Sequence, residues 1–214
     1  MIVNERFTDY INSLDTGDGD IVRSIAREAE ETFVPIIRKE TASLLKTLLE
    51  IKQPKKILEV GTATGYSALI MSEHIPAGST ITTIEKYEKR IPIARENFRR
   101  AGKEDVITLL EGDAADILAG LDGEYDFIFM DAAKGQYLNF LPHILRLLVP
   151  GGILISDNVL QDGDIIESRY AVTRRNRTIH TRMREYLYEI KHNELLQTSI
   201  ITIGDGVALS VRLK

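Results

Sequence analysis

Residues 56–67, KILEVGTATGYS, decide the fold of this chain. The apolar residues Ile57, Leu58 and Val60 predict a buried strand at 56–60, and the stretch from Gly61 to Ser67 predicts a glycine-rich turn that leads into a helix. Such a unit is typical of open α/β sheets, in which ligands bind outside the carboxyl ends of the strands. Gly61 lets the backbone approach a ligand closely, and the helix start offers unpaired N–H groups to a carboxylate or another anion.

On both sides of this stretch, short apolar runs alternate with helical stretches, which indicates repeated βαβ units and a mainly parallel sheet. We expect strands at 56–60, 80–84, 106–111, 125–130 and 152–156, and helices at 67–74, 88–101, 114–118 and 137–148. Two further runs, 198–203 and 207–213, flank Gly204-Asp205-Gly206 and predict a C-terminal antiparallel hairpin.

The length of 214 residues favours one domain, 1–214, and the chain contains no internal repeat or low-complexity linker. Within this domain we expect N-terminal helices in 1–53, a ligand-binding core in 55–157, an arginine-rich insertion in 161–193 and the hairpin in 198–213. Two apolar faces recur at helical spacing in the N-terminal part. They comprise Phe7, Tyr10, Ile11 and Leu14, and then Ala42, Leu44, Leu45, Leu48 and Leu49.

Composition excludes several classes of site. The chain has no cysteine, which removes disulfides, thiolate nucleophiles and iron–sulfur clusters, so any metal must be held by oxygen or imidazole. No apolar run approaches the roughly 18 residues of a membrane span, and the N-terminus lacks a signal-type apolar core. We therefore expect a cytoplasmic protein with no membrane partner.

Basic charge is concentrated in one segment of a chain whose net charge is −5. The segment 169–184 has six arginines and no acid in 16 residues, which leaves −11 for the remainder. Such a segment favours phosphate binding, although a solvated helix or a dimer contact with Arg–acid pairs is the alternative. The arginines are Arg169, Arg174, Arg175, Arg177, Arg182 and Arg184.

Three polar positions at successive strand ends predict a nucleoside site. Glu59 precedes the first glycine, where it would repel a pyrophosphate but suit a cation such as the amino group of S-adenosylmethionine. Glu85 ends the second strand, 24 residues past Gly61, where an acid accepts ribose hydroxyl protons. Asp113 and Ala114 follow the third strand and can contact an adenine edge. Taken singly, each acid could equally be a helix cap or a solvated charge.

Asp131, Asp157 and Asn158 follow the fourth and fifth strands, so parallel pairing would bring three oxygen donors to one edge of the sheet. Such a set, completed by water, suits Mg²⁺, whereas the alternative is that the two acids cap the next helices. Lys134 lies three residues past Asp131, and an adjacent divalent charge would lower its pKa enough for it to act as a base; otherwise it is a solvated surface lysine. The chemistry expected is deprotonation of an acceptor hydroxyl followed by in-line attack on a sulfonium methyl group.

With these motifs together, residues 35–214 resemble the cation-dependent O-methyltransferases of the catechol and caffeoyl-CoA type. The resemblance implies a Rossmann-like fold with a seven-stranded, mostly parallel sheet, S-adenosylmethionine as donor, Mg²⁺ on two vicinal acceptor oxygens, a lysine base and a homodimer. It also implies that Ile37 lies over the donor, whereas Ala42 departs from the glycine that relatives often have. The matched landmarks are Glu59, Gly61, Gly65, Tyr66, Ser67, Glu85, Gly112, Asp113, Ala114, Asp131, Lys134, Asp157 and Asn158.

Within that family, residues 157–160 and 168–184 look like the bacterial enzymes that convert 5-hydroxyuridine to 5-methoxyuridine at the tRNA wobble position. This likeness implies a tRNA anticodon loop as partner, since the 5-hydroxyl and 4-oxo groups of the base mimic the paired oxygens of a catechol. Two other hypotheses stay open. One is an O-methyltransferase of small catechols or phenols, and the other is a non-catalytic RNA-binding module.

Overall fold

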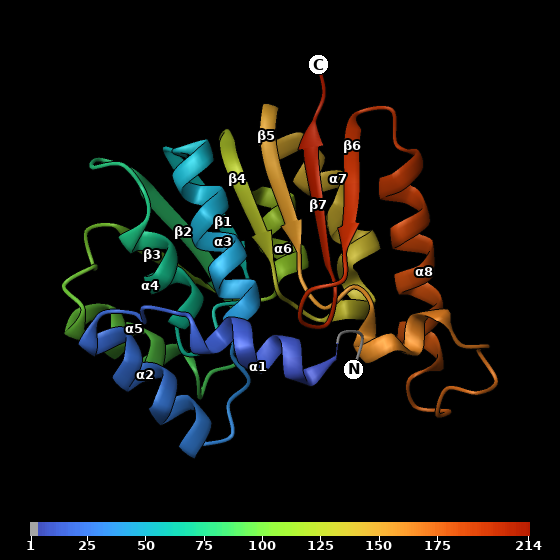
Figure 1. The fold of residues 1–214 in the computed structure, drawn as a ribbon. Helices are drawn as coiled ribbons and strands as arrows, with labels where there is room; N and C mark the ends of the chain where they lie inside the picture. The colour runs from blue at the N-terminus through green and yellow to red at the C-terminus, as the bar shows by residue number, and fades with distance from the viewer. Residues whose placement is uncertain (1–3) are drawn as a thin grey trace.

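One seven-stranded sheet, in the order β3-β2-β1-β4-β5-β7-β6, organises residues 4–214, which the computed structural model describes (Figure 1). Strands β1 to β5 are parallel, and β7 runs antiparallel to both β5 and β6. The predicted fold class and C-terminal hairpin are confirmed. The strands are β1 Lys56–Val60, β2 Thr80–Glu85, β3 Ile107–Glu111, β4 Tyr125–Met130, β5 Leu148–Ser156, β6 Leu196–Ile201 and β7 Val207–Arg212.

Helices cover both faces of the sheet because alternate strand residues point to opposite sides (Figure 1). In β1, Ile57 joins the core formed with α2 to α5, whereas Leu58 joins the core formed with α6 to α8. The helices are α1 Glu5–Ser13, α2 Asp20–Glu31, α3 Lys39–Lys52, α4 Tyr66–Glu73, α5 Ile91–Arg100, α6 Ala114–Gly120, α7 Tyr137–Leu147 and α8 Arg177–His192, with short 3₁₀ turns η1 Lys134–Gln136 and η2 Gln161–Ile166.

The two predicted N-terminal apolar faces have different fates. In α3, Ala42, Leu45 and Leu49 are buried against the sheet. In α1 the helix forms as predicted, but it has no buried residue, and Phe7 and Tyr10 are each 64% exposed. Helical spacing therefore predicted both helices correctly. Whether the apolar face of a helix is buried depends on whether that helix packs against the sheet.

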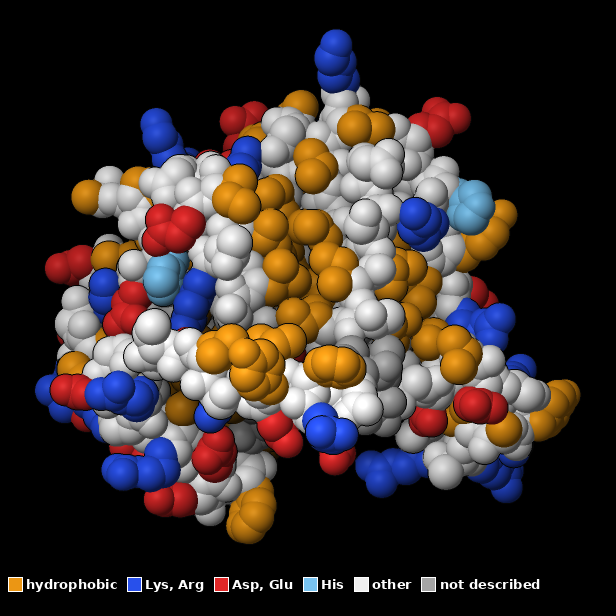
Figure 2. Space-filling model, viewed as in Figure 1, with side chains coloured by type: hydrophobic (Ala, Val, Ile, Leu, Met, Phe, Trp, Pro, Cys, Tyr) orange, Lys and Arg blue, Asp and Glu red, His pale blue; other side chains and the backbone are white. Residues whose placement is uncertain are grey.

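The face of the C-terminal hairpin on the side of α3 is also exposed to solvent. Figure 2 shows apolar side chains gathered between α3 and strands β7 and β6. Ile51, Ile200 and Val211 are among the exposed apolar residues of these elements. In residues 4–214, no helix is both long and apolar enough to cross a membrane.

The 161–193 segment lies between β5 and β6, and its helix α8 packs on the protein. It forms η2 and α8, and α8 buries Met183, Tyr186 and Ile190 in the core on the α7 side of the sheet. The Tyr186 hydroxyl hydrogen-bonds the Ser156 hydroxyl at 2.6 Å, and both side chains are buried. Helix α8 is thereby tied to the end of β5.

We predict that Tyr186→Phe lowers the free energy of unfolding by about 1–2 kcal/mol, because it leaves the buried Ser156 hydroxyl without a partner. Urea denaturation measures this change. The matched control is Tyr188→Phe on the same helix, where the ring is 65% exposed and the change should stay within about 0.5 kcal/mol. Equal effects of the two variants would contradict the role assigned to the Ser156–Tyr186 pair.

Candidate active site

A cavity of about 980 Å³ opens at the carboxyl ends of the parallel strands. Its position is the one expected for ligands of an open α/β sheet. Most of the predicted donor, cation and catalytic residues meet on its wall, whereas none of the six predicted arginines does. Those that line it are Ile37, Gly61, Glu85, Asp113, Ala114, Asp131, Lys134, Asp157 and Asn158.

The turn after β1 brings the backbone to the cavity wall. Gly61 has φ +106°, a conformation that favours glycine, and a Cβ there would lie 2.1 Å from the carbonyl oxygen of Asp131. Its N–H donates to the Ile84 carbonyl at 3.1 Å. The glycine therefore lets β1, β2 and β4 converge at one point of the site.

Glu85 is fixed by the backbone while it lines the cavity. Its Oε2 accepts the Ala63 N–H at 2.8 Å, and its Oε1 accepts the N–H groups of Lys86 and Tyr87, each at 2.9 Å. A carboxylate has about four acceptor positions, so capacity remains for a ligand hydroxyl. The carboxylate is oriented before any ligand arrives.

Asp113 combines the two roles that the sequence left open. Its Oδ1 accepts the Ala115 N–H at 2.9 Å as the N-cap of α6, and its Oδ2 pairs with Lys86 at 3.3 Å. The bond from Ala115, together with Lys86, holds the pKa of Asp113 below its usual range. Asp113 thus caps a helix and also borders the cavity next to Ala114.

Four residues of the predicted donor motif do not reach the cavity wall: Glu59, Gly65, Tyr66 and Ser67. Glu59 is fully buried, and its carboxylate accepts hydrogen bonds from Ser67 and Thr83. Burial raises the pKa of Glu59 to about 8. The expectation that Glu59 offers its charge directly to a cation on the wall is therefore wrong, and its side chain instead joins the β1–β2 floor to α4.

Gly65 and Tyr66 are structural parts of the same motif. Gly65 precedes α4 with φ +86°, and a Cβ there would lie 2.5 Å from the Phe98 ring. The Tyr66 hydroxyl donates to Asp18 at 3.3 Å. The N-terminal segment before α2 is thereby attached to the start of α4.

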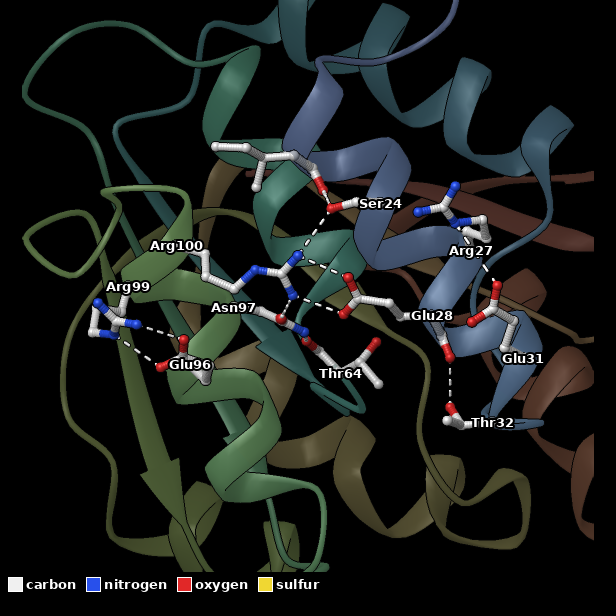
Figure 3. A network of polar contacts seen from close by, with 11 residues as sticks. Ser24, Arg27, Glu28, Glu31, Thr32, Thr64, Glu96, Asn97, Arg99 and Arg100 are labelled. Carbon is white, nitrogen blue, oxygen red and sulfur yellow. Dashed lines mark hydrogen bonds and ion pairs between the residues drawn. The ribbon is translucent and has the colours of Figure 1, made fainter.

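A polar network outside the cavity holds the same loop (Figure 3). The Asn97 amide donates to the Thr64 carbonyl at 2.9 Å, and Arg100 donates to both carboxylate oxygens of Glu28 at 2.7 Å. Arg100 also reaches Asn97 Oδ1 at 3.1 Å and Ser24 Oγ at 3.0 Å. Helices α2 and α5 therefore brace the glycine-rich loop together.

Asp131 and Asp157 stand side by side at the ends of β4 and β5. Sheet hydrogen bonds fix both, because the Asp131 N–H donates to Val60 at 3.0 Å and the Asp157 N–H donates to Met130 at 2.9 Å. Burial raises the pKa of Asp157 to about 7, and the neighbouring charge of Asp131 acts in the same direction. Burial also raises the pKa of Asp131, against the opposing charges of Lys134 and Arg90.

These residues fit a hard divalent cation. Two carboxylates, one of them 2% exposed, face one cavity with Asn158 beside them, and a cation would relieve their repulsion. Within residues 4–214, no cluster of three or more acidic or histidine side chains is arranged to hold a metal. The set of Asp131, Asp157 and Asn158 is of another kind, because its third member is an amide.

Tyr137 ties the two acidic strand ends together. Its buried hydroxyl lies 3.1 Å from the carbonyl oxygens of both Met130 and Asp157, and it accepts the Ala132 N–H at 3.3 Å. Its ring packs edge-on against Tyr186 with centroids 5.4 Å apart. The two strand ends are thus connected by one side chain from α7.

Lys134 begins η1 and lines the cavity, so it is more than a solvated surface lysine. Arg182 of α8 donates to the Gly135 carbonyl at 2.9 Å and holds this turn. Among the six predicted arginines, Arg177 bonds the Val172 carbonyl at 3.3 Å and Arg184 bonds the Ile165 carbonyl at 3.4 Å. Within residues 4–214, none of the six is ion-paired with an acid.

Sequence reasoning missed Arg38 and Asp205, which both line the cavity. Arg38 forms ion pairs with Asp205 and Asp162. The sequence indicated only a turn at Gly204-Asp205-Gly206. However, β6 pairs antiparallel with β7, which is antiparallel to β5, so β6 runs parallel to the other strands and ends at their carboxyl edge. The predicted hairpin therefore already contained the signal that its turn lies at the site.

Comparison with known proteins identifies the family. The family described as O-methyltransferase matches residues 18–213. This chain belongs to that family. The O-methyltransferase is 32% identical over 164 residues to a catechol O-methyltransferase of Niastella koreensis, covering 74% of each chain. It is 31% identical over 186 residues to a putative caffeoyl-CoA O-methyltransferase of Arabidopsis thaliana, covering 86% of this chain and 79% of the relative.

Solved structures agree with this assignment. A putative caffeoyl-CoA O-methyltransferase of Staphylococcus aureus is 30% identical, with a TM-score of 0.86 over 97% of this chain and 98% of that one. The SAH-bound methyltransferase PaMTH1 of Podospora anserina is 26% identical, with a TM-score of 0.88 over 98% and 95% of the two chains. The protein is thus an O-methyltransferase of the catechol and caffeoyl-CoA type.

We predict that Gly61→Ala weakens both the fold and the binding of S-adenosylhomocysteine, because the added Cβ meets the Asp131 backbone. The free energy of unfolding should fall by at least about 2 kcal/mol more than in the control variant described next. The Kd for S-adenosylhomocysteine, measured by calorimetry, should rise at least about tenfold. The control is Gly78→Ala, which has φ +83° but no atom within 4 Å of the added Cβ. If Gly78→Ala lowered the free energy of unfolding as much as Gly61→Ala does, the cause would be the left-handed backbone conformation and not the close approach to Asp131.

We predict that Glu59→Gln gains stability over the wild type as the pH rises from about 5 to 8. The folded-state pKa of about 8 lies above the usual 4.5, so the unfolded chain releases this proton first and the wild type loses stability across that interval. The gain should be about 1 kcal/mol per pH unit and should level off above pH 8. Urea unfolding of the ligand-free proteins at four pH values measures it. A difference that does not vary with pH would contradict the buried, protonated state.

Proposed function

We propose that this O-methyltransferase moves the methyl group of S-adenosylmethionine to one of two adjacent oxygens on a small catechol-type acceptor, with the help of Mg²⁺. The relatives named above support this acceptor class through their catechol and caffeoyl-CoA activities. The observation that carries the proposal is the meeting of Asp131, Asp157 and Lys134 on one cavity wall.

The donor would lie along the ends of β1, β2 and β3. Glu85 offers its remaining acceptor positions to the ribose hydroxyls, and Asp113 and Ala114 border the adenine. Gly61 gives the methionine end access to the backbone. Ile37, which also lines the cavity, contributes an apolar cover. A positively charged sulfonium ion would suit this position, because a nearby positive charge favours the ionised forms of Asp131 and Asp157.

Asp131, Asp157 and Asn158 would hold the divalent cation. Such a cation would supply positive charge that lowers the pKa of the acceptor hydroxyl. Lys134 accepts the proton of that hydroxyl at Nζ. The acceptor oxygen then forms the new bond to the methyl carbon as the carbon–sulfur bond breaks, and the electron pair stays on sulfur.

A second candidate acceptor is 5-hydroxyuridine in a tRNA anticodon loop, and the arginine segment favours it. Arg169, Arg174 and Arg175 are exposed, and no carboxylate within residues 4–214 pairs with them. They are therefore available to phosphates, and affinity for RNA would fall steeply with added salt. Arg182 connects this segment to the Lys134 turn. A non-catalytic RNA-binding module would bind RNA through the same arginines and would not need Lys134.

We predict that Lys134→Ala lowers kcat about 10²- to 10⁴-fold while leaving the Kd for S-adenosylhomocysteine within a factor of about two, because the lysine acts on the acceptor proton. Methyl transfer with Mg²⁺ is measured on catechol and on tRNA that carries 5-hydroxyuridine. The control is Lys55→Ala, next to the start of β1 at the opposite edge of the sheet. Full activity of Lys134→Ala would contradict the base.

The two acceptors are separated in the same assay by a variant in which Arg169, Arg174 and Arg175 are all alanine. If tRNA is the acceptor, this variant loses tRNA methylation and the wild type loses it as salt rises, whereas catechol turnover is unchanged. If catechols are the acceptors, neither the wild type nor the variant methylates tRNA at any salt concentration. Methylation of neither, with Mg²⁺ and donor saturating, would overturn the proposed function. The homodimer stays a prediction from the resemblance.

A further inference from the structure

The turn between β6 and β7 is joined closely to the loop that follows β5. The Val159 N–H donates to the Gly206 carbonyl and the Leu160 N–H donates to the Asp205 carbonyl, each at 2.9 Å. A Cβ on Gly206 would lie 2.3 Å from Leu160 Cγ. These contacts fix the turn directly beside Asn158, which is one of the oxygen donors assigned to the cation.

The side chains repeat this link. Asn158 Nδ2 donates to Asp205 Oδ2 at 3.3 Å. A carboxylate only accepts hydrogen bonds, so it selects the nitrogen of the amide and turns the amide oxygen the other way. That selection matters because only the oxygen binds a hard cation. Asn158 has φ +57°, a left-handed conformation that asparagine tolerates better than most residues.

Asp205 is itself held in place. Its side chain is 14% exposed, and Arg38 at the start of α3 forms ion pairs with both Asp205 and Asp162 of η2. One oxygen of Asp205 faces Arg38 and the other faces Asn158. Asp205 Oδ1 is ion-paired with Arg38 but accepts no hydrogen bond, and Oδ2 accepts the Asn158 amide, so Asp205 is placed to orient that amide.

On the basis of the proposed function, we infer that Asp205 is a positioning residue that orients the Asn158 amide so that its oxygen faces the cation. Arg38 fixes the position of Asp205. The orienting contact thus comes from the C-terminal hairpin, which is remote in sequence from both acidic strand ends. Hydrogen bonds to the residues that bind a metal commonly change its affinity about 10- to 100-fold.

The test replaces Asp205 by asparagine, whose amide can donate as well as accept and so no longer selects the Asn158 nitrogen. Mn²⁺ binding to the full chain is measured by electron paramagnetic resonance titration, without donor or acceptor. We expect Asp205→Asn to raise the Mn²⁺ Kd about tenfold. The matched control is Asp122→Asn, which makes the same acid-to-amide change at an exposed aspartate paired with Arg146 away from the cavity, and its Kd should stay within about twofold of the wild type.

Two further measurements separate positioning from a general structural effect. The Kd for S-adenosylhomocysteine and the unfolding midpoint of Asp205→Asn should match those of the wild type, and its kcat should recover at saturating Mg²⁺. In an Asn158→Ala background, Asp205→Asn should not weaken Mn²⁺ binding further, because its effect passes through the amide. A further tenfold loss in that background would overturn the inference and make Asp205 a ligand in its own right.

The remaining outcomes are also decisive. If the wild type binds Mn²⁺ and Asp157→Ala does not, the cation site of the proposed function stands. An unchanged Kd in Asp205→Asn then overturns only the positioning role. If the wild type itself binds no Mn²⁺, the proposed function fails, and the positioning role fails with it.

Discussion

Repulsion between two carboxyl groups, those of Asp131 and Asp157, is the constraint on which the rest of the site depends. Parallel pairing places them at the ends of adjacent strands, and the sheet fixes their backbones, so they cannot move apart. Burial then raises the pKa of both groups. A cavity of this kind gains most from ligands that bring positive charge, and a sulfonium donor and a divalent cation both do so. Lys134 and Arg90 supply only part of that charge.

The sequence predicted the residues at or just beyond the strand ends better than those further inside the strands. Glu85, Asp113, Asp131 and Asp157 all line the cavity, because each stands where a parallel strand reaches the common edge. Glu59 lies inside β1, where side chains alternate between the faces of the sheet. It shares the face of Ile57 and therefore meets Ser67 of α4 rather than the cavity. The motif was recognised correctly, but the direction of one side chain was not.

Residues missed from the sequence act through contacts between distant parts of the chain. Arg38 and Asp162 are 124 positions apart, and Asn158 and Asp205 are 47 apart. No local pattern indicates such pairs, and a Gly-Asp-Gly stretch predicts a turn whatever its aspartate contacts. Topology could have located Asp205, since the predicted hairpin returns β6 to the edge of the site. The exposed face of α1 is the opposite case, because periodicity indicates an apolar face without indicating what covers it.

Acceptor choice must be made outside the reacting centre. The cavity floor provides groups for a donor, a cation and two adjacent oxygens, and both a catechol and a 5-hydroxyuracil present such oxygens. On the proposed function, the remainder of the acceptor would reach past this floor toward η1, whose Lys134 and Gln136 line the cavity. Here Arg182 holds the turn of Lys134 through the Gly135 carbonyl. A polyanion bound along the arginines would thus contact the element that carries the base, whereas a free catechol would depend on the floor alone.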